Sequence, residues 1–368
     1  MQVTAALAPE KGAPFRLETL ALADPGPDEL VVRVAACGVC QTDAHGRDDY
    51  FGIPFPCVFG HEGAGVVERL GKDVTGFAAG ERVLMVSPSC GACKACALGL
   101  PGYCASARRI KFGGRLRDGR VPFHRNGEPV HGAFFQQSAF ASHALATQRN
   151  IVKVPDELPL EQAAAFACGL NTGVGAVLNV LRPAPGSAIA VFGAGTVGLA
   201  AVMAARIADC GVILAVDLHE SRLALAGGLG ATHVCNAATA DPVAAIRAAT
   251  GGAGAEASIE AAGNPLALRQ AMDCLAPLGV CVLVGSARKG VEACLEMAQL
   301  QHGRTLRGCI QGDAPPADFF PRLFELWRTG RLPVERLIRF YDFADINLAM
   351  ADAAAGHAVK PVLRMEQA

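Results

Sequence analysis

The sequence has few aromatic residues and little net charge for its 368 residues. It contains three Tyr and one Trp, and its 33 basic and 34 acidic side chains leave a formal net charge of −1. Because no Lys/Arg run and no basic stripe with interleaved aromatics occurs, we expect no nucleic-acid partner. Hydrophobic residues make up 51% of the chain and charged residues 18%, which is typical of globular domains with aliphatic cores.

Residues 1–15 show no basic segment followed by an apolar one, so they do not signal secretion. We therefore expect a cytoplasmic protein. Residues 183–205 contain no charged side chain and are long enough to cross a bilayer. Gly193, Gly195 and Gly198 interrupt this stretch, which favours a buried strand that turns into a buried helix, and no membrane partner is expected.

The pattern along the chain predicts two kinds of domain. A length of about 150 residues per domain suggests two of them. Up to about residue 150, short predicted strands such as 29–35 and 63–68 are separated by Gly/Pro-rich turns and cysteine clusters. From about residue 187, strands and helices alternate, which predicts an α/β fold with a doubly wound parallel sheet. The predicted strands are 188–192, 212–217, 257–260, 280–285 and 360–365, and the predicted helices are 196–208, 221–229, 319–329 and 346–355.

A glycine motif follows the first of these later strands and opens a helix: Gly193-Ala194-Gly195-Thr196-Val197-Gly198. The first glycine permits a tight turn, the second lets the backbone approach a pyrophosphate, and the third allows close packing of the helix on the strand. In a chain with 42 glycines the motif alone is weak, and its place between strand and helix gives it weight. We predict a dinucleotide site.

The next predicted strand ends at Asp217, about 20 residues further on, where a carboxylate would bind the adenosine ribose. Capping of the following helix is the alternative role for Asp217. Since a carboxylate repels the 2′-phosphate of NADP, we expect NAD, and the nearby Arg222 is the one feature that weakens this preference.

Fourteen cysteines without a secretory leader indicate metal binding rather than disulfides. Four of them have the spacing C-x2-C-x2-C-x7-C, which can surround one Zn²⁺ and leave no open position for a substrate. We predict a structural zinc in a lobe at about residues 90–104. A redox Cys-x-x-Cys pair or incidental buried thiols are the alternatives. The four predicted ligands are Cys90, Cys93, Cys96 and Cys104.

A catalytic zinc needs three protein ligands and one open position. Cys40, His61 and Cys168 are the best candidates, but they are far apart in the sequence, so spacing alone does not group them. Taken singly, each is equally compatible with a core histidine or a small apolar cysteine.

Together these motifs resemble the zinc-containing medium-chain alcohol dehydrogenase family, and most closely its bacterial aryl-alcohol (benzyl-alcohol) members. The resemblance extends nearly end to end, through Gly60-His61-Glu62-Gly63-Ala64-Gly65, the cysteine lobe, the glycine motif with Asp217, and residues 346–365. It implies a mainly β, GroES-like catalytic domain at residues 1–169 and 313–368. A Rossmann domain that binds NAD is then inserted at residues 170–312, with the active site in the cleft between the domains, and the protein is a homodimer or homotetramer.

The resemblance also assigns roles around the catalytic zinc. Cys40, His61 and Cys168 become its ligands, Glu62 lies close to the metal, and Asp43 holds the second imidazole nitrogen of His61.

A proton relay is implied as well, from the Thr42 hydroxyl through the cofactor ribose to the His45 imidazole at the surface. An exposed loop histidine without a role is the alternative for His45. Thr172 and Lys360 are placed at the cofactor, and Lys360 is expected near the pyrophosphate, where it offsets the missing basic residue at Gln41.

The segment Phe134-Phe135-Gln136-Gln137-Ser138 resembles the corresponding part of the aryl-alcohol dehydrogenases. Two rings at the wall of a pocket favour a flat apolar alcohol, and Phe51 and Val86 are further wall candidates by position. The alternative is that the two Phe side chains only fill the core. We expect a primary aromatic or allylic/terpenoid alcohol to be oxidised to its aldehyde by hydride transfer to NAD, with zinc lowering the pKa of the alcohol.

Other functions stay open at this level. They are a broad-range aliphatic alcohol dehydrogenase, a glutathione-dependent formaldehyde dehydrogenase, a zinc-free quinone or enoyl reductase, and a zinc-binding redox sensor that retains a dead dehydrogenase site. The reductase is disfavoured because it would lack Cys40, His61 and the cysteine lobe together.

Overall fold

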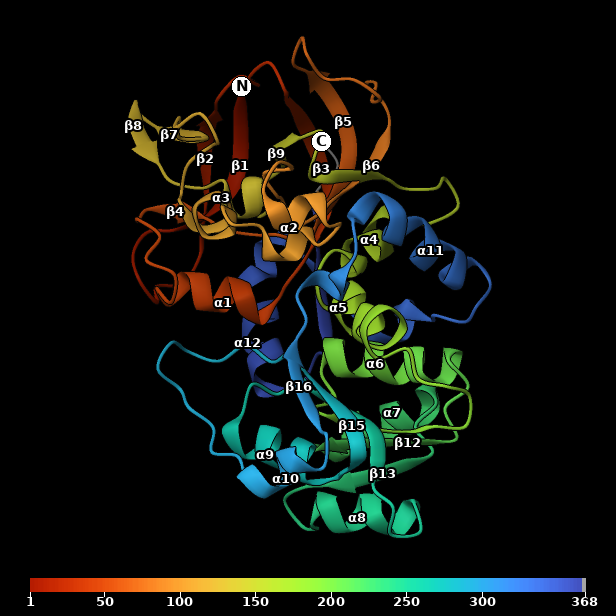
Figure 1. Ribbon diagram of the computed structural model, residues 1–368. Coiled ribbons are helices and arrows are strands. Elements are labelled where there is room, and N and C mark those ends of the chain that lie inside the picture. Colours follow the sequence, from red (N-terminus) through yellow and green to blue (C-terminus); the bar gives the residue numbers. More distant parts are fainter. Residues whose placement is uncertain (366–368) are drawn as a thin grey trace. The chain divides into compact units, whose positions relative to one another are not determined.

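The computed structural model describes residues 1–365, and the chain forms two compact units. Within the described residues, the first unit comprises 1–168, 315–328 and 333–365, and the second comprises Gly169–Ala314 and Thr329–Leu332. Figure 1 shows the first unit, in red to yellow and again in dark blue, as mainly strands, and the second, in green to light blue, as a sheet with helices. Both ends of the sequence therefore build the first unit.

Two sheets form the framework of the first unit. One has the strand order β4-β1-β2-β7-β8, and the other has the order β10-β6-β5-β3-β18-β17, with β9 also paired to β3. Aliphatic side chains from both sheets form one core cluster, which includes Val31, Val32 and Leu145. The bounds are β1 (Gln2–Ala8), β2 (Arg16–Leu22), β3 (Glu29–Gly38), β4 (Cys57–Val58), β5 (Gly63–Leu70), β6 (Arg82–Met85), β7 (Phe123–Arg125), β8 (Glu128–Val130), β9 (His143–Thr147), β10 (Ile151–Lys153), β17 (Ile338–Asp342) and β18 (Lys360–Arg364).

The central strand β3 positions the segments that carry the predicted zinc ligands. In its register Cys37 lies opposite Gly63 of β5 and opposite Leu363 of β18. Because β3 ends at Gly38 and β5 begins at Gly63, the residues just outside these strand ends come close together. The pairing therefore brings Cys40 next to His61.

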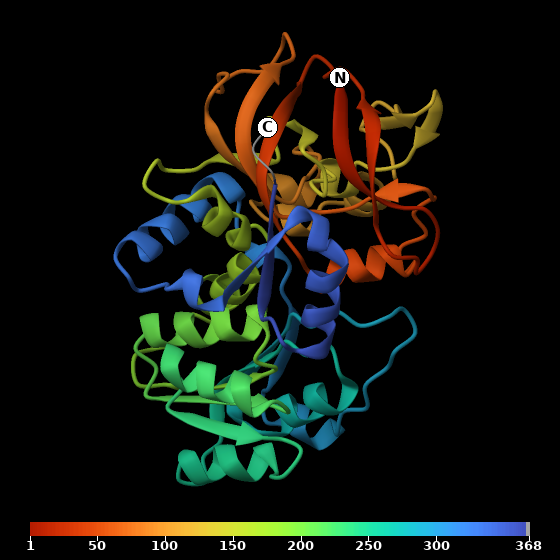
Figure 2. The same ribbon diagram turned by 180° about the vertical axis from the view of Figure 1, so that it is seen from behind.

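Short helices complete the first unit. Figure 2 shows α12 beside β18, against which it packs. Helix α12 ends at Ala355, and the next residue, Gly356, has φ 80°. This left-handed conformation suits a glycine at the end of a helix. The bounds are α1 (Gln41–Arg47), α2 (Lys94–Ala97), α3 (Ala107–Phe112), α4 (Leu160–Ala163), α11 (Pro316–Arg328) and α12 (Ile346–Ala355), with 3-10 turns at Pro101–Tyr103, Phe134–Gln136, Ala164–Phe166, Val334–Leu337 and Phe343–Asp345.

The second unit contains a six-stranded parallel sheet in the order β13-β12-β11-β14-β15-β16, which is the strand order of a Rossmann fold. The central β11 is buried along its whole length, as expected for a strand covered on both faces. This confirms the predicted doubly wound sheet. The bounds are β11 (Ala188–Phe192), β12 (Val212–Asp217), β13 (His233–Asn236), β14 (Ala255–Glu260), β15 (Leu275–Leu283), β16 (Thr305–Gly308), α5 (Gly169–Gly175), α6 (Thr196–Ile207), α7 (Glu220–Leu229), α8 (Pro242–Ala249), α9 (Pro265–Asp273) and α10 (Met297–Gln301), with a π-helical turn at Ala176–Leu181 and a 3-10 turn at Gln311–Asp313.

The uncharged stretch of residues 183–205 is β11 followed by most of α6, and most of its side chains in these elements are buried. This confirms the interpretation as a buried strand and helix. Across residues 1–365 no single helix is long and apolar enough to span a membrane, although the bent pair Leu160–Phe166 and Gly169–Leu181 passes on length and composition.

Candidate active site

Three predicted zinc ligands and one acidic neighbour converge in the first unit. The ligand atoms of Cys40, His61, Glu62 and Cys168 all lie within 4.8 Å of one another. Cys40 immediately precedes α1, and His61 lies in the turn before β5. Cys168 lies between the 3-10 turn at Ala164–Phe166 and the start of α5 at Gly169. The fold thus groups residues that the sequence spacing left apart.

Asp43 organises this group from α1, and its side chain is fully buried. One carboxylate oxygen lies 2.9 Å from His61 Nδ1 and accepts the Gly60 N–H at 3.1 Å. The other accepts the Cys40 N–H at 3.0 Å. A single carboxylate therefore fixes the ring orientation of His61 and the backbone of Cys40, and this geometry supports the predicted role of Asp43.

The imidazole of His61 then presents its other nitrogen to the group. Nε2 is buried and has no hydrogen-bond partner among the described residues. Two sulfurs, an imidazole nitrogen and a carboxylate oxygen are a donor set that suits Zn²⁺. The residues present therefore fit a zinc ion, which would give the buried Nε2 atom its missing partner.

The pKa values of the two cysteines in this group are shifted in opposite directions. A hydrogen bond between the two sulfurs holds the pKa of Cys40 well below its usual range and the pKa of Cys168 well above it. Burial alone would lower the pKa of His61, but the charge and hydrogen bond of Asp43 outweigh it and raise that pKa. One negative charge is thus already stabilised at Cys40.

The Glu62 carboxylate is held by Lys360 at the start of β18. Lys360 Nζ donates to the two Glu62 oxygens at 2.8 and 2.6 Å and to the Val39 carbonyl at 3.3 Å, and both side chains are buried. Burial raises the pKa of Glu62 to about 7 despite the nearby ammonium. Glu62 thus balances the charge of Lys360. The expected place of Lys360 near a pyrophosphate, where it would offset the missing basic residue at Gln41, stays a prediction.

Aromatic rings lie directly against the His61 imidazole. The Phe135 ring is stacked on it at 4.6 Å between centroids and 27° between planes, and the Phe134 ring meets it edge-on at 5.6 Å. Phe112 of α3 extends this group, because it stacks on Phe51 at 4.1 Å and meets Phe135 edge-on at 5.5 Å. We call Phe51, Phe112, Phe134 and Phe135 the ring wall.

Two roles were open for Phe134 and Phe135 from the sequence: lining a substrate pocket or filling the core. Phe134 and Phe135 belong to the core cluster of the first unit, while Phe51 and Phe112 are partly buried and pack against it. Core packing and contact with a site residue therefore occur together. Val86 is buried at the residue after β6, and its place in a substrate pocket stays a prediction.

The backbone that carries the two central rings is strained. Phe135, Gln136 and Ser138 all have φ between 53° and 55°, in the left-handed region that disfavours side chains. Gln137 holds this segment in place, because its Nε2 donates to the His61 carbonyl at 3.0 Å and its Oε1 accepts the Gly63 N–H at 3.1 Å. No role is expected for Gln137 from the sequence, although it lies between Phe135 and Ser138 in the segment that resembles the aryl-alcohol dehydrogenases.

Lys111 is a second residue that sequence reasoning missed. Its Nζ lies 5.3 Å from the centroid of the Phe135 ring, and the side chain is 6% exposed. Burial lowers the pKa of Lys111, and the thiols of Cys168 and Cys104 act in the opposite direction. Among residues 1–365 no carboxylate pairs with this ammonium. In the sequence, a single lysine before a phenylalanine carries no signal of such a role.

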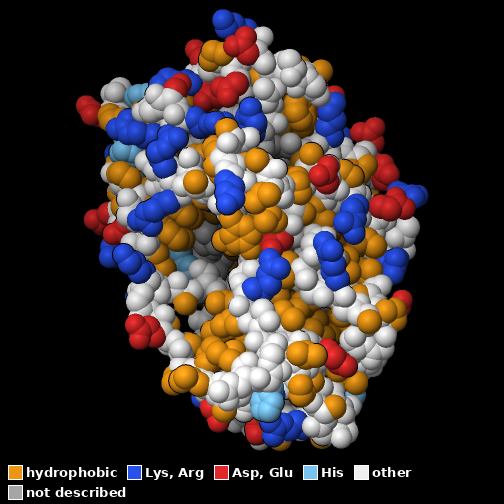
Figure 3. All heavy atoms as spheres, in the orientation of Figure 1, with side chains coloured by type: hydrophobic (Ala, Val, Ile, Leu, Met, Phe, Trp, Pro, Cys, Tyr) orange, Lys and Arg blue, Asp and Glu red, His pale blue; other side chains and the backbone are white. Residues whose placement is uncertain are grey.

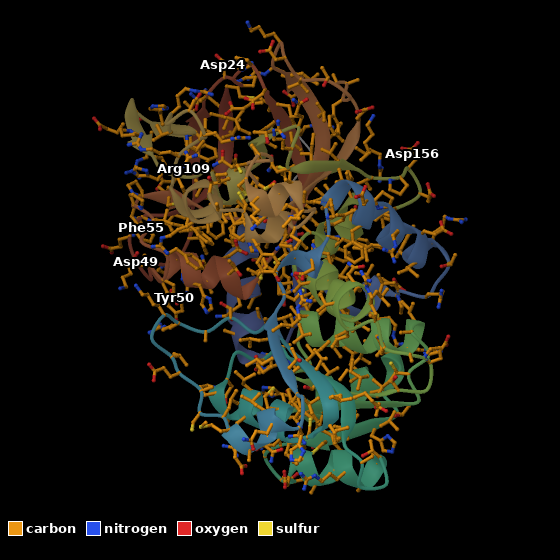
Figure 4. All side chains as sticks on the ribbon, viewed as in Figure 1. Asp24, Asp49, Tyr50, Phe55, Arg109 and Asp156 are labelled. Atoms are coloured by element: carbon orange, nitrogen blue, oxygen red, sulfur yellow. The ribbon has the colours of Figure 1, made fainter. Side chains whose placement is uncertain are left out.

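The two predicted relay residues lie on α1. The Thr42 hydroxyl is 3.7 Å from the Cys40 sulfur. His45 is 8% exposed and stacked on Tyr50 at 4.2 Å, so its imidazole is covered and does not lie at the surface as expected. Figure 4 marks Tyr50 close to α1. Because residues three positions apart share one face of a helix, Thr42 and His45 lie on the same face of α1.

The four cysteines of the lobe also converge. Their sulfurs lie within 4.8 Å of one another, and two backbone N–H groups point at them, from Cys90 to the Cys104 sulfur at 3.2 Å and from Ala105 to the Cys93 sulfur at 3.4 Å. The N–H groups of Ala105 and Cys96 lower the pKa of Cys93 to about 6. Four thiols arranged in this way fit one structural Zn²⁺.

The glycine motif of the second unit has the geometry that its sequence predicts. Gly193 has φ 95°, and a Cβ on Gly198 would collide with the Gly193 carbonyl, so both positions require glycine. A Cβ on Gly195, by contrast, would meet nothing within 4 Å. Gly195 therefore leaves open space at the N-terminus of α6, where a pyrophosphate would be bound.

Asp217 ties this loop to the end of β12. Its Oδ2 accepts the Ala194 N–H at 2.6 Å, and its Oδ1 accepts the N–H groups of Leu218 and His219. Arg222 lies 4.0 Å from the carboxylate. Because α7 is capped at His219 and not by Asp217, the alternative role as a helix cap is not supported. Thr172 lies on α5 of the same unit, largely buried.

Replacing Asp217 by Ser should lower kcat/KM for NAD by about 10- to 100-fold, the range expected for loss of hydrogen bonds to a charged group. The same change should raise the relative rate with NADP, because the repulsion of the 2′-phosphate is removed. Initial rates with both cofactors measure the effect. Asp209→Ser, which removes an exposed carboxylate of the same unit, is the control. An unchanged NAD/NADP preference in Asp217→Ser would refute the assignment.

A Rossmann sheet in one unit and a Cys/His/Cys group in the other define a metal-dependent dehydrogenase. The comparisons agree with this class. The family model described as "Alcohol dehydrogenase GroES-like domain" matches residues 26–156, and that described as "Zinc-binding dehydrogenase" matches residues 196–328. The chain therefore belongs to the zinc-containing alcohol dehydrogenase family, and it is an alcohol dehydrogenase.

Individual relatives match over almost the whole chain. A geraniol dehydrogenase from Castellaniella defragrans is 41% identical over 98% of this chain and 96% of its own length. Alcohol dehydrogenase 1 from Zea mays is 35% identical over 98% of this chain and 97% of its own length. Among solved structures, benzyl alcohol dehydrogenase from Acinetobacter calcoaceticus is 39% identical with a TM-score of 0.96, and both chains are covered fully. An alcohol dehydrogenase zinc-binding domain protein from Burkholderia ambifaria is 46% identical with a TM-score of 0.97 and equal coverage.

Proposed function

We propose that this protein oxidises primary aromatic or allylic alcohols to aldehydes with NAD. The observation that carries the proposal is the stacking of Phe135 on the His61 imidazole, with Phe134 edge-on to the same ring. A ring wall that begins at a metal ligand favours alcohols whose reacting carbon is attached to a flat apolar group. The named relatives that act on geraniol and on benzyl alcohol support the same substrate classes.

Zinc, when held by Cys40, His61 and Cys168, would lower the pKa of the bound alcohol, and NAD, when bound, would accept the hydride. The residues of the chain supply the rest. Asp43 keeps the His61 ring oriented with Nε2 towards the ligand group, and the Phe rings exclude water from one side of it.

Proton removal is assigned to α1. The Thr42 hydroxyl, next to Cys40, would accept the alcohol proton and pass it towards His45. Glu62 stays paired with Lys360, so that this carboxylate adds no net charge beside the ligands.

Cofactor binding is assigned to the second unit. The open space at Gly195 and the Asp217 carboxylate support NAD, with Thr196, Val197 and Gly198 forming the first turn of α6. The proposal includes two zinc ions per chain, a homodimer or homotetramer, and the cytoplasm as location. Light scattering on the purified protein tests the assembly.

Initial rates of NADH formation with benzyl, cinnamyl and geranyl alcohol, butanol and S-hydroxymethylglutathione test the substrate class. Phe135→Leu keeps an apolar side chain but removes the ring, and should lower kcat/KM for benzyl alcohol by about three- to tenfold, as ring contacts of about 0.5–1.5 kcal/mol predict. The rate with butanol should hardly change. Phe340→Leu, at a half-exposed ring on β17, is the matched control.

Two results would refute parts of this proposal separately. If butanol or S-hydroxymethylglutathione were preferred over the aromatic and allylic alcohols, the substrate class would be wrong and the dehydrogenase would remain. If zinc-replete protein reduced NAD with none of the five compounds, the activity itself would be refuted, and a zinc-binding sensor would become the better interpretation.

A further inference from the structure

A cavity of about 220 Å³ lies in the first unit, next to the end of α3, and none of the residues that line it is a predicted zinc ligand. Three arginines are among the residues that line it, Arg109, Arg115 and Arg117, together with Gln136, and Arg115 Nη1 donates to the Gly119 carbonyl at 3.0 Å. Figure 3 shows Lys and Arg side chains gathered over the region of α3 and the β7–β8 hairpin, and Figure 4 labels Arg109 there. We call this cavity the arginine cavity.

The positive charges of the arginine cavity are not neutralised by the protein. Within residues 1–365 none of its three arginines forms an ion pair with a carboxylate. The acidic residue closest in sequence, Asp118, is engaged by Arg120 at 2.5 Å, and Arg120 in turn binds Glu29 at 2.7 Å. Three neighbouring guanidinium groups without counter-charges suit an anion with several acceptor oxygens.

Gln136 supplies a second, independent indication of a ligand. Its side chain is 2% exposed, and its Nε2 donates to the carbonyls of Ile110 at 2.9 Å and Arg115 at 3.0 Å. Because both partners accept, the amide cannot be turned over, and Oε1 is fixed on the other side. That oxygen is buried and has no partner in the described part of the chain. A buried acceptor of this kind requires a donor such as a hydroxyl group.

We propose that the arginine cavity binds a hydroxylated phosphate monoester. A phosphate group offers about two negative charges and three acceptor oxygens to the three arginines. A hydroxyl group on the organic part would donate to Gln136 Oε1. The volume of about 220 Å³ exceeds what a few water molecules need and leaves room for a small organic part besides the phosphate.

The arginine cavity is distinct from the site of alcohol oxidation, but Gln136 links the two. Gln136 directly follows Phe135, whose ring stacks on His61. Its amide donates to the Ile110 carbonyl of α3, the helix that also carries Lys111 and Phe112 of the ring wall. A ligand on Gln136 would stiffen the segment behind the ring wall. Binding itself does not depend on the proposed substrate.

Titration calorimetry with glycerol 3-phosphate tests the proposal on the full-length wild-type protein. We expect binding with a Kd of about 1 mM or below, and a loss of at least about tenfold in the double variant Arg109→Ala/Arg117→Ala. Arg125→Ala, an exposed arginine on β7 paired with Glu18, should leave the Kd unchanged. Methyl phosphate, which lacks the hydroxyl group, should bind more weakly than glycerol 3-phosphate.

Four outcomes would overturn the proposal. They are an absence of heat up to about 10 mM glycerol 3-phosphate, equal weakening by Arg125→Ala, equal affinity for methyl phosphate, and loss of the signal when NAD is added. The last result would place the phosphate at the glycine motif instead. Circular dichroism of the variants separates a lost site from a lost fold.

Discussion

Replacing Cys40 by Ser should reduce the bound zinc from two ions to one per chain and lower kcat/KM for benzyl alcohol by about 10³-fold or more. The sulfur of Cys40 is the ligand whose ionised form the site favours most, since its pKa is held well below the usual range by Cys168 and by His61. A bound metal would stabilise the developing negative charge by several kcal/mol. At about 1.4 kcal/mol per tenfold change in rate, its loss corresponds to a decrease of about 10³-fold in kcat/KM. Elemental analysis and initial rates measure the two effects.

Cys37→Ser is the matched control for this experiment. Cys37 lies three residues earlier, is equally a cysteine, and is buried in β3 with its sulfur donating to the Gly38 carbonyl at 3.4 Å. A serine hydroxyl can make the same hydrogen bond, so this variant should keep both zinc ions and the activity. If Cys40→Ser retained two zinc ions, or if both variants lost one, the ligand assignment would be wrong.

The fold of the second unit could be predicted where strands are buried and continuous. Residues 188–192 and 212–217 were predicted with the bounds that β11 and β12 have, because uninterrupted apolar runs end there at glycine or aspartate. The outer strands β13 and β16 were missed. Both lie at edges of the sheet and expose half or more of their side chains, so neither leaves an apolar pattern in the sequence.

The candidate site likewise has one part that the sequence predicts and one part that only the fold brings together. Cysteine spacing alone predicts the lobe, because all four ligands come from one short segment. The group of Cys40, His61 and Cys168 depends on the register of β3 with β5, which no local pattern encodes, and only the family resemblance named it in advance. The ion pair of Glu62 with Lys360 joins residues 298 positions apart, and Lys111 reaches Phe135 only through the packing of α3. Such contacts become visible in the folded chain alone.

Replacing Cys96 by Ser should remove the other zinc ion and lower the melting temperature by about 10 °C, since a structural zinc contributes several kcal/mol and each kcal/mol is worth about 2–4 °C in domains of this size. We expect the lobe to depend on a metal because few apolar contacts hold it. In the described chain, no residue from 86 to 111 belongs to the core cluster of the first unit, and Leu98 is 66% exposed. Calorimetry and limited proteolysis at residues 90–104 measure the loss.

The control is Cys294→Ser, which changes an exposed cysteine of the second unit. It should leave the zinc content and the melting temperature unchanged. In Cys96→Ser the catalytic ligands are intact, so the remaining zinc should resist chelation as in the wild type, while the lobe alone becomes sensitive to protease. A Cys96→Ser protein that kept two zinc ions, or that melted within about 2 °C of the wild type, would show that the lobe is held by its backbone and hydrogen bonds and not by a metal.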